Sequence, residues 1–262
     1  MQDILKSNTP AFVFDTAALK KRVAQIKEIV GETVSLCYSM KANPFFVPAM
    51  ITCVDKLEVC SPGELTICKK LGVDASRIIY SGVNKEIPDI KEAYEYGVGT
   101  FTAESVRQAD LIQQVVETAA VGEKAEVILR LNSGSQFGMS KEDLLTILQC
   151  RESKYTSLNF TGIHYFVGTQ RKRAKRKIKE LQMLLELFEE IQNKCGLKLK
   201  KLEYGPGFAV PYFEDDDFED TLYPVKELKD TLKQVAQQVD LTIEMGRFFT
   251  AECGTYYTNV AR

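Results

Sequence analysis

Val34-Ser35-Leu36-Cys37-Tyr38 is a short apolar run that continues into Ser39-Met40-Lys41-Ala42-Asn43-Pro44. Its length and composition are typical of a buried β-strand, and Ala42-Asn43-Pro44 predicts a turn directly after it. The ammonium of Lys41 would then project from the carboxyl end of the strand, the face of an α/β barrel that carries active sites. A lysine there can form a Schiff base with an aldehyde, provided that burial or a cationic neighbour lowers its pKa. Position alone fits a solvated lysine at a strand end better, because lysines are rarely buried.

Apolar β-type runs alternate with helical stretches along almost the whole chain. Its 262 residues suffice for one sizeable core, and the alternation predicts parallel strands joined by helical crossovers. Because about eight such units follow the first strand, we expect one α/β domain over residues 1–262, a (β/α)8 barrel rather than an open sheet. The expected strands are Ala11–Phe14, Val34–Tyr38, Lys56–Val59, Ile78–Tyr80, Gly99–Thr102, Glu126–Leu131, Asn159–Tyr165, Lys201–Tyr204 and Leu241–Glu244. The expected helices are Thr16–Val30, Gly63–Leu71, Glu86–Tyr96, Val106–Val116, Lys141–Cys150, Arg171–Cys195 and Val225–Val239.

The composition narrows the classes of function. The net charge is −2, and 45% of the residues are hydrophobic. This balance argues against a general nucleic-acid-binding surface, and no apolar run approaches the roughly 20 residues of a membrane span. Met1–Lys6 lacks the apolar core of a signal peptide. The seven cysteines form no CxxC pair and the chain has one histidine, which argues against a zinc site and fits a cytoplasmic protein.

Two charged runs each fit more than one interpretation. Arg171-Lys172-Arg173 and Lys175-Arg176-Lys177 open the longest expected helix. They could contact nucleic acid, but the neutral chain favours a solvated helix face. Glu214-Asp215-Asp216-Asp217, with Glu219-Asp220, follows a glycine turn. It could form a lid over a cationic substrate, although a solvated loop is favoured.

Four further elements place chemistry where strands end. Tyr204-Gly205-Pro206-Gly207-Phe208 has glycines that let backbone N–H groups approach a phosphate, although the same pattern marks ordinary turns. Val167-Gly168-Thr169-Gln170 offers a hydroxyl and backbone donors. Glu244-Met245-Gly246-Arg247 places a carboxylate and a guanidinium at the barrel mouth. Arg130 lies in the apolar run Ile128-Leu129-Arg130-Leu131-Asn132, where burying its charge is costly unless an anion or acceptor awaits it.

Together these groups describe a ligand with an aldehyde, a phosphate and a heteroaromatic ring. Lys41 suits the aldehyde, and an acid such as Glu244 suits a ring nitrogen. The glycine turns and an arginine suit the phosphate. Pyridoxal 5′-phosphate (PLP) combines these features, so the sequence predicts a PLP site.

The chain resembles the fold-type III PLP-dependent decarboxylases, which include diaminopimelate, ornithine and arginine decarboxylases, with alanine racemase as a distant relative. The resemblance runs from Thr9 to the final residue, and its six motifs occur in order at compatible spacings. With the family pattern after each, they are Tyr38-Ser39-Met40-Lys41-Ala42-Asn43 (Y-A-x-K-A-N), Cys60-Ser61-Pro62-Gly63-Glu64-Leu65 (S-x-G-E-L), Ser81-Gly82-Val83-Asn84-Lys85 (G-x-N-K), Gly162-Ile163-His164-Tyr165-Phe166-Val167-Gly168-Thr169-Gln170 (G-x-H-x-H-x-G-S-Q), Gly205-Pro206-Gly207-Phe208 (G-G-G-F) and Glu244-Met245-Gly246-Arg247 (E-P-G-R).

The resemblance implies a TIM-like barrel of the alanine racemase type and a role for each matching residue. Lys41 would hold PLP through a Schiff base, Glu244 would keep the pyridinium nitrogen protonated, and Arg130 would contact the phenolic oxygen. His164 and Phe166 would complete the cofactor-binding set within the barrel. The phosphate would be bound by Thr169, Gly205, Gly207 and Arg247.

Three positions depart from the family pattern. Phe166 stands where the family has the histidine that stacks on the PLP ring, and a phenyl ring can stack but cannot hydrogen-bond or carry charge. His164, two residues earlier, should point to the same face and support the site from the barrel interior. Met245 replaces a proline. Pro206 replaces the middle glycine of the phosphate turn and removes one N–H donor, which predicts weaker phosphate binding.

The acid at the ring nitrogen bears on reaction type. A protonated pyridinium is a deep electron sink for the carbanion that remains when CO2 departs, whereas a racemase of this fold presents an arginine there. We therefore interpret the chain as a decarboxylase, or its cofactor-binding half, that acts through Lys41. Its substrate would be an amino acid of the diaminopimelate or ornithine type, or a modified, for example carrier-linked, amino acid. The alternatives are a non-catalytic single-domain protein that binds or buffers PLP and, less favoured, an amino-acid racemase.

Family decarboxylases continue past the last motif into a β-rich C-terminal domain. In the family dimer that domain completes the other subunit's site with a cysteine–aspartate pair and a tyrosine. This chain stops at Tyr257–Arg262, about where the crossing into that domain should begin, and Cys253 falls too early to replace the cysteine. We therefore expect a barrel that lacks the β-domain, works as a homodimer or with a companion C-terminal β-domain, and obtains its reprotonating acid from there.

Overall fold

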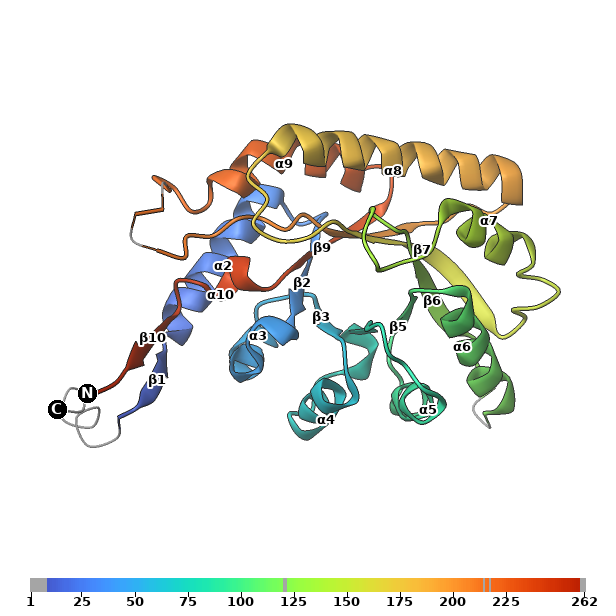
Figure 1. Cartoon of the computed structure of the whole chain (residues 1–262), viewed down its shortest axis with the longest axis horizontal. Coiled ribbons are helices and arrows are strands. Elements are labelled where there is room, and N and C mark those ends of the chain that lie inside the picture. The colour runs from blue at the N-terminus through green and yellow to red at the C-terminus, as the bar shows by residue number, and fades with distance from the viewer. Residues whose placement is uncertain (1–8, 120–121, 214, 217, 260–262) are drawn as a thin grey trace.

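Eight parallel strands close into a barrel with helices on its outside (Figure 1). The structure is a computed structural model that describes residues 9–119, 122–213, 215–216 and 218–259. The N-terminal stretch Met1–Lys6, Glu214 and Asp217 of the acidic run, and the last three residues of the chain lie outside the described residues. The (β/α)8 barrel that the alternating pattern predicts is confirmed.

Strand order around the barrel follows chain order, and β9 closes onto β2 through pairs such as Leu36 with Ile243. Each expected strand is present within one residue at either end, because each run is long enough to bury an apolar face and is bounded by turns. The strands are β2 (Ser35–Ser39), β3 (Lys56–Val59), β4 (Ile78–Tyr80), β5 (Thr100–Ala103), β6 (Ala125–Arg130), β7 (Leu158–Phe166), β8 (Lys201–Gly205) and β9 (Asp240–Met245).

The expected helices are also present, with shifts at their ends. Thr16–Val30 is helical as predicted, whereas the longest helix begins at Ala174 rather than Arg171. None of the described helices is long and apolar enough to cross a membrane. The helices are α2 (Thr16–Val30), α3 (Val47–Met50), α4 (Pro62–Lys70), α5 (Ile87–Tyr96), α6 (Val106–Thr118), α7 (Lys141–Gln149), α8 (Ala174–Cys195), α9 (Tyr223–Ala236) and α10 (Arg247–Thr250). Short 3-10 helices are η1 (Met40–Ala42), η2 (Pro44–Phe46) and η3 (Ala75–Arg77).

The two faces of the barrel strands differ in character. Successive side chains point to opposite faces of a strand, so Leu36 and Cys37 on β2 lie on different sides. Leu36 belongs to the large apolar core shared with helices such as α2. Cys37 belongs to a separate small cluster with Ile79 and Ile128, at the barrel axis. The remaining inward positions nearer the strand ends are mostly polar or charged, and these build the site described below.

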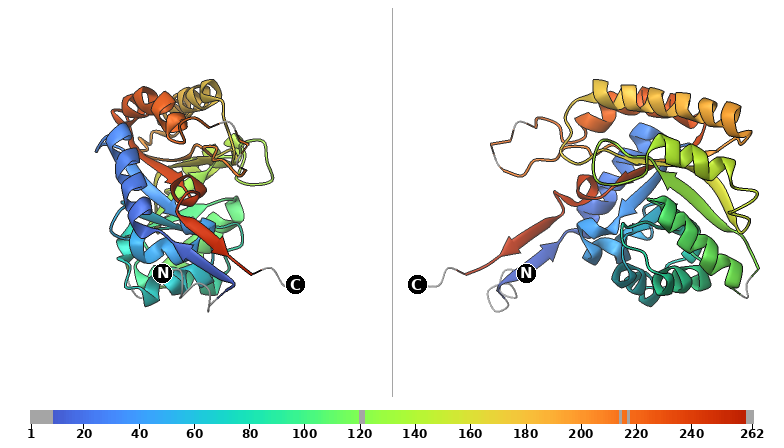
Figure 2. Two further views of the ribbon diagram at one scale, coloured as in Figure 1. Left: turned by 90° about the vertical axis from the view of Figure 1, so that its left-hand side faces the viewer. Right: turned by 45° about the vertical axis from the view of Figure 1, so that its right-hand side comes forward.

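A two-stranded antiparallel ribbon projects from the barrel, as Figure 2 shows. β1 (Ala11–Phe14) pairs along its length with β10 (Gly254–Tyr257). The sequence predicts β1, but β10 escapes prediction because all four of its residues are exposed and carry no burial pattern. The ribbon therefore brings the two ends of the described chain together outside the barrel.

The basic run at the start of α8 is solvated for the most part, as the sequence favours, but two of its six residues are not. Lys177 is 1% exposed, and its ammonium donates to the carbonyl of Arg171 at 2.7 Å. The guanidinium of Arg171 forms an ion pair with Glu180. Because the helix begins at Ala174, Lys177 follows one turn later on the stripe that α8 buries. The expectation is wrong for Arg171 and Lys177, while Lys172, Arg173, Lys175 and Arg176 are exposed.

Two described acids of the Glu214–Asp220 run, Asp216 and Asp220, make local contacts. The Asp216 carboxylate accepts from the backbone N–H groups of Tyr212 and Phe213 at 2.6 and 3.1 Å. Asp220 accepts from the backbone N–H of Leu222 and pairs with Lys226 at 2.8 Å. These local contacts are those of a turn-rich loop, and the role of this loop as a lid stays a prediction.

Candidate active site

A cavity of about 250 Å³ opens at the carboxyl ends of β2, β7, β8 and β9. This is the face on which barrel enzymes carry their active sites. Lys41, Phe166, Thr169, Gly207, Glu244 and Arg247, singled out in the sequence, all line it. Three others, Arg130, His164 and Gly205, lie outside the lining. The lining also includes Ser39, Ala42, Gln170, Phe208, Met245, Gly246 and Phe248.

Lys41 lies in η1, directly after β2, and its ammonium faces two carboxylates. Its Nζ is 2.9 Å from Oε2 of Glu58 and 3.8 Å from Oε1 of Glu244. The Sγ of Cys60 lies 3.6 Å away. Partial burial lowers the pKa of Lys41, but the charges of Glu58 and Glu244 outweigh it and hold the pKa well above its usual range. The structure therefore does not give Lys41 the lowered pKa that the sequence argument requires, because Lys41 is a paired ammonium.

Glu244 is held in place from several sides at the end of β9. Its side chain is 3% exposed, and its Oε2 accepts from Nε2 of His164 at 2.9 Å. The Ser39 hydroxyl lies 3.1 Å from Glu244 and 2.6 Å from Glu58, and its single hydrogen serves one of the two. Burial raises the pKa of Glu244, but Lys41 and His164 outweigh it and lower the pKa below its usual range. Glu244 is therefore an ionised carboxylate in a dry setting, suited to face a cationic ring nitrogen.

His164 lies inside the barrel, as strand alternation predicts, and is 1% exposed. Its register partner on β8 is Glu203, whose side chain is also buried. Nδ1 of His164 and both carboxyl oxygens of Glu203 have no hydrogen-bond partner among the described residues. Burial lowers the pKa of His164, but its hydrogen bond to Glu244 and the charges of Glu244 and Glu203 raise it above its usual value. Glu203, His164 and Glu244 thus form a row of titratable groups across three adjacent strands.

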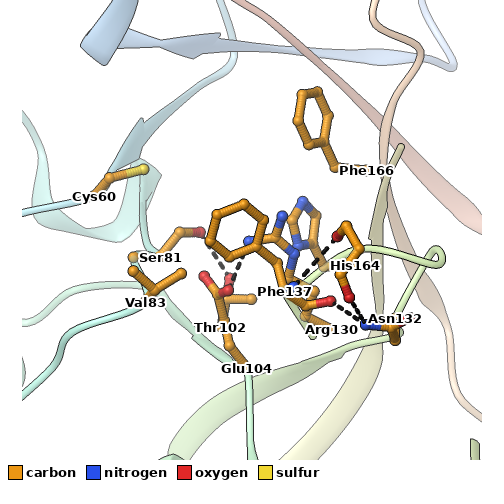
Figure 3. A network of polar contacts seen from close by, with 12 residues as sticks. Cys60, Ser81, Val83, Thr102, Glu104, Arg130, Asn132, Phe137, His164 and Phe166 are labelled. Carbon is orange, nitrogen blue, oxygen red and sulfur yellow. Dashed lines mark hydrogen bonds and ion pairs between the residues drawn. The ribbon is translucent and has the colours of Figure 1, made fainter. Parts of the chain in front are cut away.

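Arg130 finds its acceptor within the chain. Its Nη1 lies 2.6 Å from Oε2 of Glu104, and the two side chains are only 11% and 5% exposed. The ring of Phe137 lies 5.2 Å from the guanidinium carbon. Figure 3 shows this network next to His164, with Phe166 set apart from it. The buried arginine is therefore stabilised by a carboxylate from the end of β5 before any ligand arrives.

Close packing requires glycine at the end of β8 and in the turn that follows it, because a side chain there would overlap neighbouring atoms. Gly207 has φ +58°, and a Cβ there would lie 1.8 Å from the carbonyl oxygen of Gly168. A Cβ on Gly205 would lie 2.4 Å from the Phe166 ring. The turn after β8 and the loop after β7 therefore touch, and their backbones form one wall of the cavity. The guanidinium carbon of Arg247 lies 5.6 Å from the Tyr212 ring at the same end.

Sequence reasoning misses three acids, Glu58, Glu104 and Glu203. Each is buried and faces a basic group or the barrel axis. A signal was present, because Glu58 and Glu203 interrupt apolar strands just as Arg130 does. The sequence does not reveal which residue each acid faces, because that depends on the register between neighbouring strands.

Comparison with known proteins gives one family match and many related structures. The pyridoxal binding domain of the pyridoxal-dependent decarboxylases matches residues 16–251. The L-glutamyl-[BtrI acyl-carrier protein] decarboxylase of Niallia circulans is 27% identical, over 96% of this chain and 63% of that protein. The diaminopimelate decarboxylase of Aquifex aeolicus is 26% identical, over 96% and 62%.

Solved structures repeat the same coverage. The diaminopimelate decarboxylase from M. jannaschi superimposes with a TM-score of 0.83 at 21% identity, covering 96% of this chain and 64% of that one. The Vibrio vulnificus lysine/ornithine decarboxylase complexed with putrescine gives 0.81 at 21% identity, covering 95% and 66%. These likenesses establish the alanine racemase-type barrel. The chain spans just under two thirds of the length of the curated relatives named here.

Proposed function

The chain belongs to the pyridoxal-dependent decarboxylases, as their pyridoxal binding domain, and from this premise we propose that it binds PLP and decarboxylates an amino acid. The observation that carries the proposal is the pairing of Lys41 with Glu244 across one cavity. An amine that can bond an aldehyde faces an ionised, buried carboxylate that can hold a pyridinium nitrogen. When bound, PLP supplies the electron sink that stabilises the carbanion left by the departing CO2.

The residues present fit the parts of PLP. Lys41 would bond the aldehyde carbon, and Glu244 would face the ring nitrogen. Phe166 lines the cavity and would pack on the ring, with Arg130 and His164 behind it. A Cβ on Gly207 would overlap the carbonyl of Gly168, so glycine at 207 lets the two backbones meet beside the position that we assign to the phosphate. The phosphate would be held by Thr169, Gly205, Gly207 and Arg247.

The chain's own groups prepare this site in defined ways. Glu58 and Glu244 hold the Lys41 ammonium at the cavity wall. His164 donates to Glu244 and keeps that carboxylate ionised and oriented. Arg130, which lies outside the cavity lining, is already paired with Glu104, and its remaining N–H groups would be the ones to contact a phenolic oxygen.

The presence of phenylalanine at position 166 supports the view that the acid that returns a proton to the product comes from outside this chain's barrel. A phenyl ring has no proton to give, although it can pack on a heteroaromatic ring. The half-buried thiol of Cys60 near Lys41 is a poor substitute, because burial and the charge of Glu58 raise its pKa far above the usual range and make it a weak acid. We assign the acid to a homodimer partner or a companion C-terminal β-domain.

The β1–β10 ribbon is the surface we assign to that β-domain. Phe12 and Tyr256 are 69% and 54% exposed, and their rings lie 4.7 Å apart. Phe45, 77% exposed, extends the aromatic surface through Phe14. Exposed aromatic groups next to an open sheet edge are typical of an interaction surface. The longer relatives have the residues to supply a domain there.

For the substrate we propose an amino acid of the diaminopimelate or ornithine type, or a modified one. The modified class has support from the Niallia circulans relative, whose name gives a carrier-bound glutamyl group as substrate. The second candidate function is a PLP-binding protein without turnover, which the phenyl ring at position 166 favours. An amino-acid racemase is disfavoured, because the group that we assign to the ring nitrogen is Glu244, which lines the cavity, rather than an arginine.

An absorbance spectrum with added PLP tests the first step. Wild type should develop the band near about 420 nm that marks lysine-bound PLP, removable by borohydride. Lys41→Ala should lack it, while Lys69→Ala, on the surface of α4, should retain it. CO2 release is then measured with free and carrier-linked amino acids, with and without a β-domain from a relative. PLP binding without CO2 under every condition would overturn the decarboxylase and support the binding protein.

A further inference from the structure

The loop after β7 and the turn after β8 are fastened to each other by backbone contacts. The backbone N–H of Arg171 donates to the carbonyl of Gly207 at 2.9 Å. Arg171 and Phe208 form an isolated parallel bridge at the same point. Thr169 and Gln170 on one side and Gly207 on the other all line the cavity. The relative position of these two segments therefore fixes the shape of one end of the cavity.

Gln170 is the residue that makes this fastening unusual. Its φ is +56°, and it is the one non-glycine residue with positive φ in the part of the chain that the structure describes. Its side-chain amide meets the backbone of Val210 twice. Nε2 donates to the Val210 carbonyl at 2.8 Å, and Oε1 accepts from the Val210 N–H at 2.8 Å. The two hydrogen bonds offset the energetic cost of the left-handed backbone conformation at Gln170. A side chain that cannot form them would let the backbone relax to another conformation more readily.

A second set of contacts holds the next residue. The Arg171 guanidinium pairs with Glu180 on α8, and its Nη1 lies 3.0 Å from Oε2. The Tyr204 hydroxyl on β8 donates to the same Oε2 at 2.8 Å. Lys177 donates to the Arg171 carbonyl at 2.7 Å. Helix α8 and strand β8 are thus both tied to Arg171, so Gln170 is bounded on its C-terminal side by a fixed residue.

We propose that Gln170 is a positioning residue that presets the anion-binding end of the cavity, so that the chain recognises PLP by its phosphate and rejects pyridoxal. The inference rests on the proposed PLP binding and deepens it. A wall that is already ordered loses little conformational entropy when an anion binds. The phosphate group should therefore bind more tightly, while the affinity for the rest of the ligand stays the same. This preset wall offsets the N–H donor that Pro206 lacks.

Dissociation constants for PLP and for pyridoxal, measured by absorbance, test the proposal. Wild type should bind PLP much more tightly than pyridoxal. Gln170→Ala should lower that preference about tenfold, as expected for the loss of two neutral hydrogen bonds, and leave pyridoxal affinity within about twofold. Inorganic phosphate should compete with PLP about tenfold less well in Gln170→Ala than in wild type.

The chain offers a matched control in Gln108, whose amide makes the same kind of clamp away from this wall. Oε1 of Gln108 accepts from the backbone N–H of Glu104 at 2.9 Å, and Nε2 donates to the carbonyl of Val83 at 2.9 Å. Gln108→Ala should leave the ratio of the two dissociation constants unchanged. Gln170→Met, which keeps the length of the side chain but loses both hydrogen bonds without adding charge, should lower the ratio as the alanine variant does and serves if that variant does not fold.

Hydrogen exchange of the chain without PLP gives a second, independent readout. The Val210 amide should exchange faster in Gln170→Ala and remain protected in Gln108→Ala. A preserved preference for PLP together with a protected Val210 amide in Gln170→Ala would overturn the inference and leave the proposed function standing. Equal affinity of wild type for PLP and pyridoxal would also overturn it. Failure of wild type to bind either compound would instead overturn the proposed function, and this inference with it.

Discussion

The Glu58 carboxylate lies 2.9 Å from the Lys41 ammonium; Glu58 is in strand β3, and Lys41 directly follows the neighbouring strand β2. Glu58 is 2% exposed, so its charge acts through little intervening water. Together with Glu244 it holds the pKa of Lys41 above the usual range, despite the partial burial that works in the opposite direction. Because an amine attacks an aldehyde only in its neutral form, Glu58 sets the pH at which Lys41 can react.

We therefore expect Glu58→Gln to capture PLP faster near neutral pH. Removal of the negative charge lowers the pKa of Lys41, so a larger fraction of the amine is neutral below that pKa. A shift of one pKa unit corresponds to an increase of about tenfold in rate at about pH 7. The effect is measured as the rate at which the absorbance band of lysine-bound PLP develops, recorded across pH. Glu64→Gln is the control, since Glu64 bonds the Cys60 backbone rather than the lysine. An unchanged pH profile in Glu58→Gln would remove Glu58 from this role.

The buried Arg130–Glu104 pair should be important for stability. Glu104→Gln leaves a guanidinium that is 11% exposed without its counter-charge, and we expect a loss of about 3 kcal/mol in the free energy of unfolding. Urea denaturation of the chain without PLP measures it. The exposed pair Lys69–Glu92 is the comparison, with Nζ and Oε1 2.8 Å apart against 2.6 Å in the buried pair. Glu92→Gln should cost less than about 0.5 kcal/mol. Equal losses in the two variants would contradict the assignment.

His164, the one histidine of the chain, makes a direct titration feasible. Its pKa lies above the usual value because Glu244 and Glu203 outweigh burial. The imidazolium should therefore persist above about pH 6.5 and be lost as pH rises through the raised pKa. The charged groups that face it are Glu244, Glu203 and Arg130.

Glu203→Gln should move the His164 titration to lower pH, because the Glu203 carboxylate favours the imidazolium. Burial raises the pKa of Glu203 to about 8, so the difference from wild type should grow as the pH approaches 8 and the carboxyl ionises. Nuclear magnetic resonance of the single labelled imidazole gives the midpoint without assignment. Glu126→Gln is the control, since Glu126 pairs with Lys201. A midpoint in Glu203→Gln equal to that of wild type would show that Glu203 does not act on His164.

Two glycines with similar φ angles allow the cost of an atomic overlap to be distinguished from the cost of a left-handed backbone. Gly207 and Gly196 have φ +58° and +62°. A Cβ at Gly207 would lie 1.8 Å from the Gly168 carbonyl oxygen, whereas a Cβ at Gly196 would have no neighbouring atom within 4 Å. Gly196→Ala should cost about 1 kcal/mol, the strain of the left-handed backbone. Gly207→Ala should cost more than that and abolish PLP binding. Thermal unfolding and the PLP spectrum measure both, and PLP binding by Gly207→Ala at wild-type affinity would refute the contact argument.

Much of this architecture could be predicted because it depends on local patterns. Apolar runs of strand length that alternate with amphipathic helices predict the barrel, and helix α2 matches its expected bounds residue for residue. Its buried positions Leu19, Val23, Ile26 and Val30 recur at helical spacing, and Asp15 accepts from the N–H of Ala18 at 2.9 Å to begin it. Lys41, Glu244 and Arg247 could be placed at one cavity because parallel strands present their carboxyl ends on one face.

Closure of the barrel decided the rest. Arg130 requires an acceptor, but only the register of β5 and β6 identifies it as Glu104. Glu58, Glu203 and His164 acquire their electrostatic roles only when eight strands bring their inward faces together. The pairing of β1 with β10 joins residues more than two hundred positions apart, and no local pattern encodes it. The sequence by itself determined which residues form strands and helices and which chemical groups stand at their ends. The tertiary structure decided the charge states of those groups, because a pKa depends on which charges lie within a few ångströms in a medium of low dielectric constant.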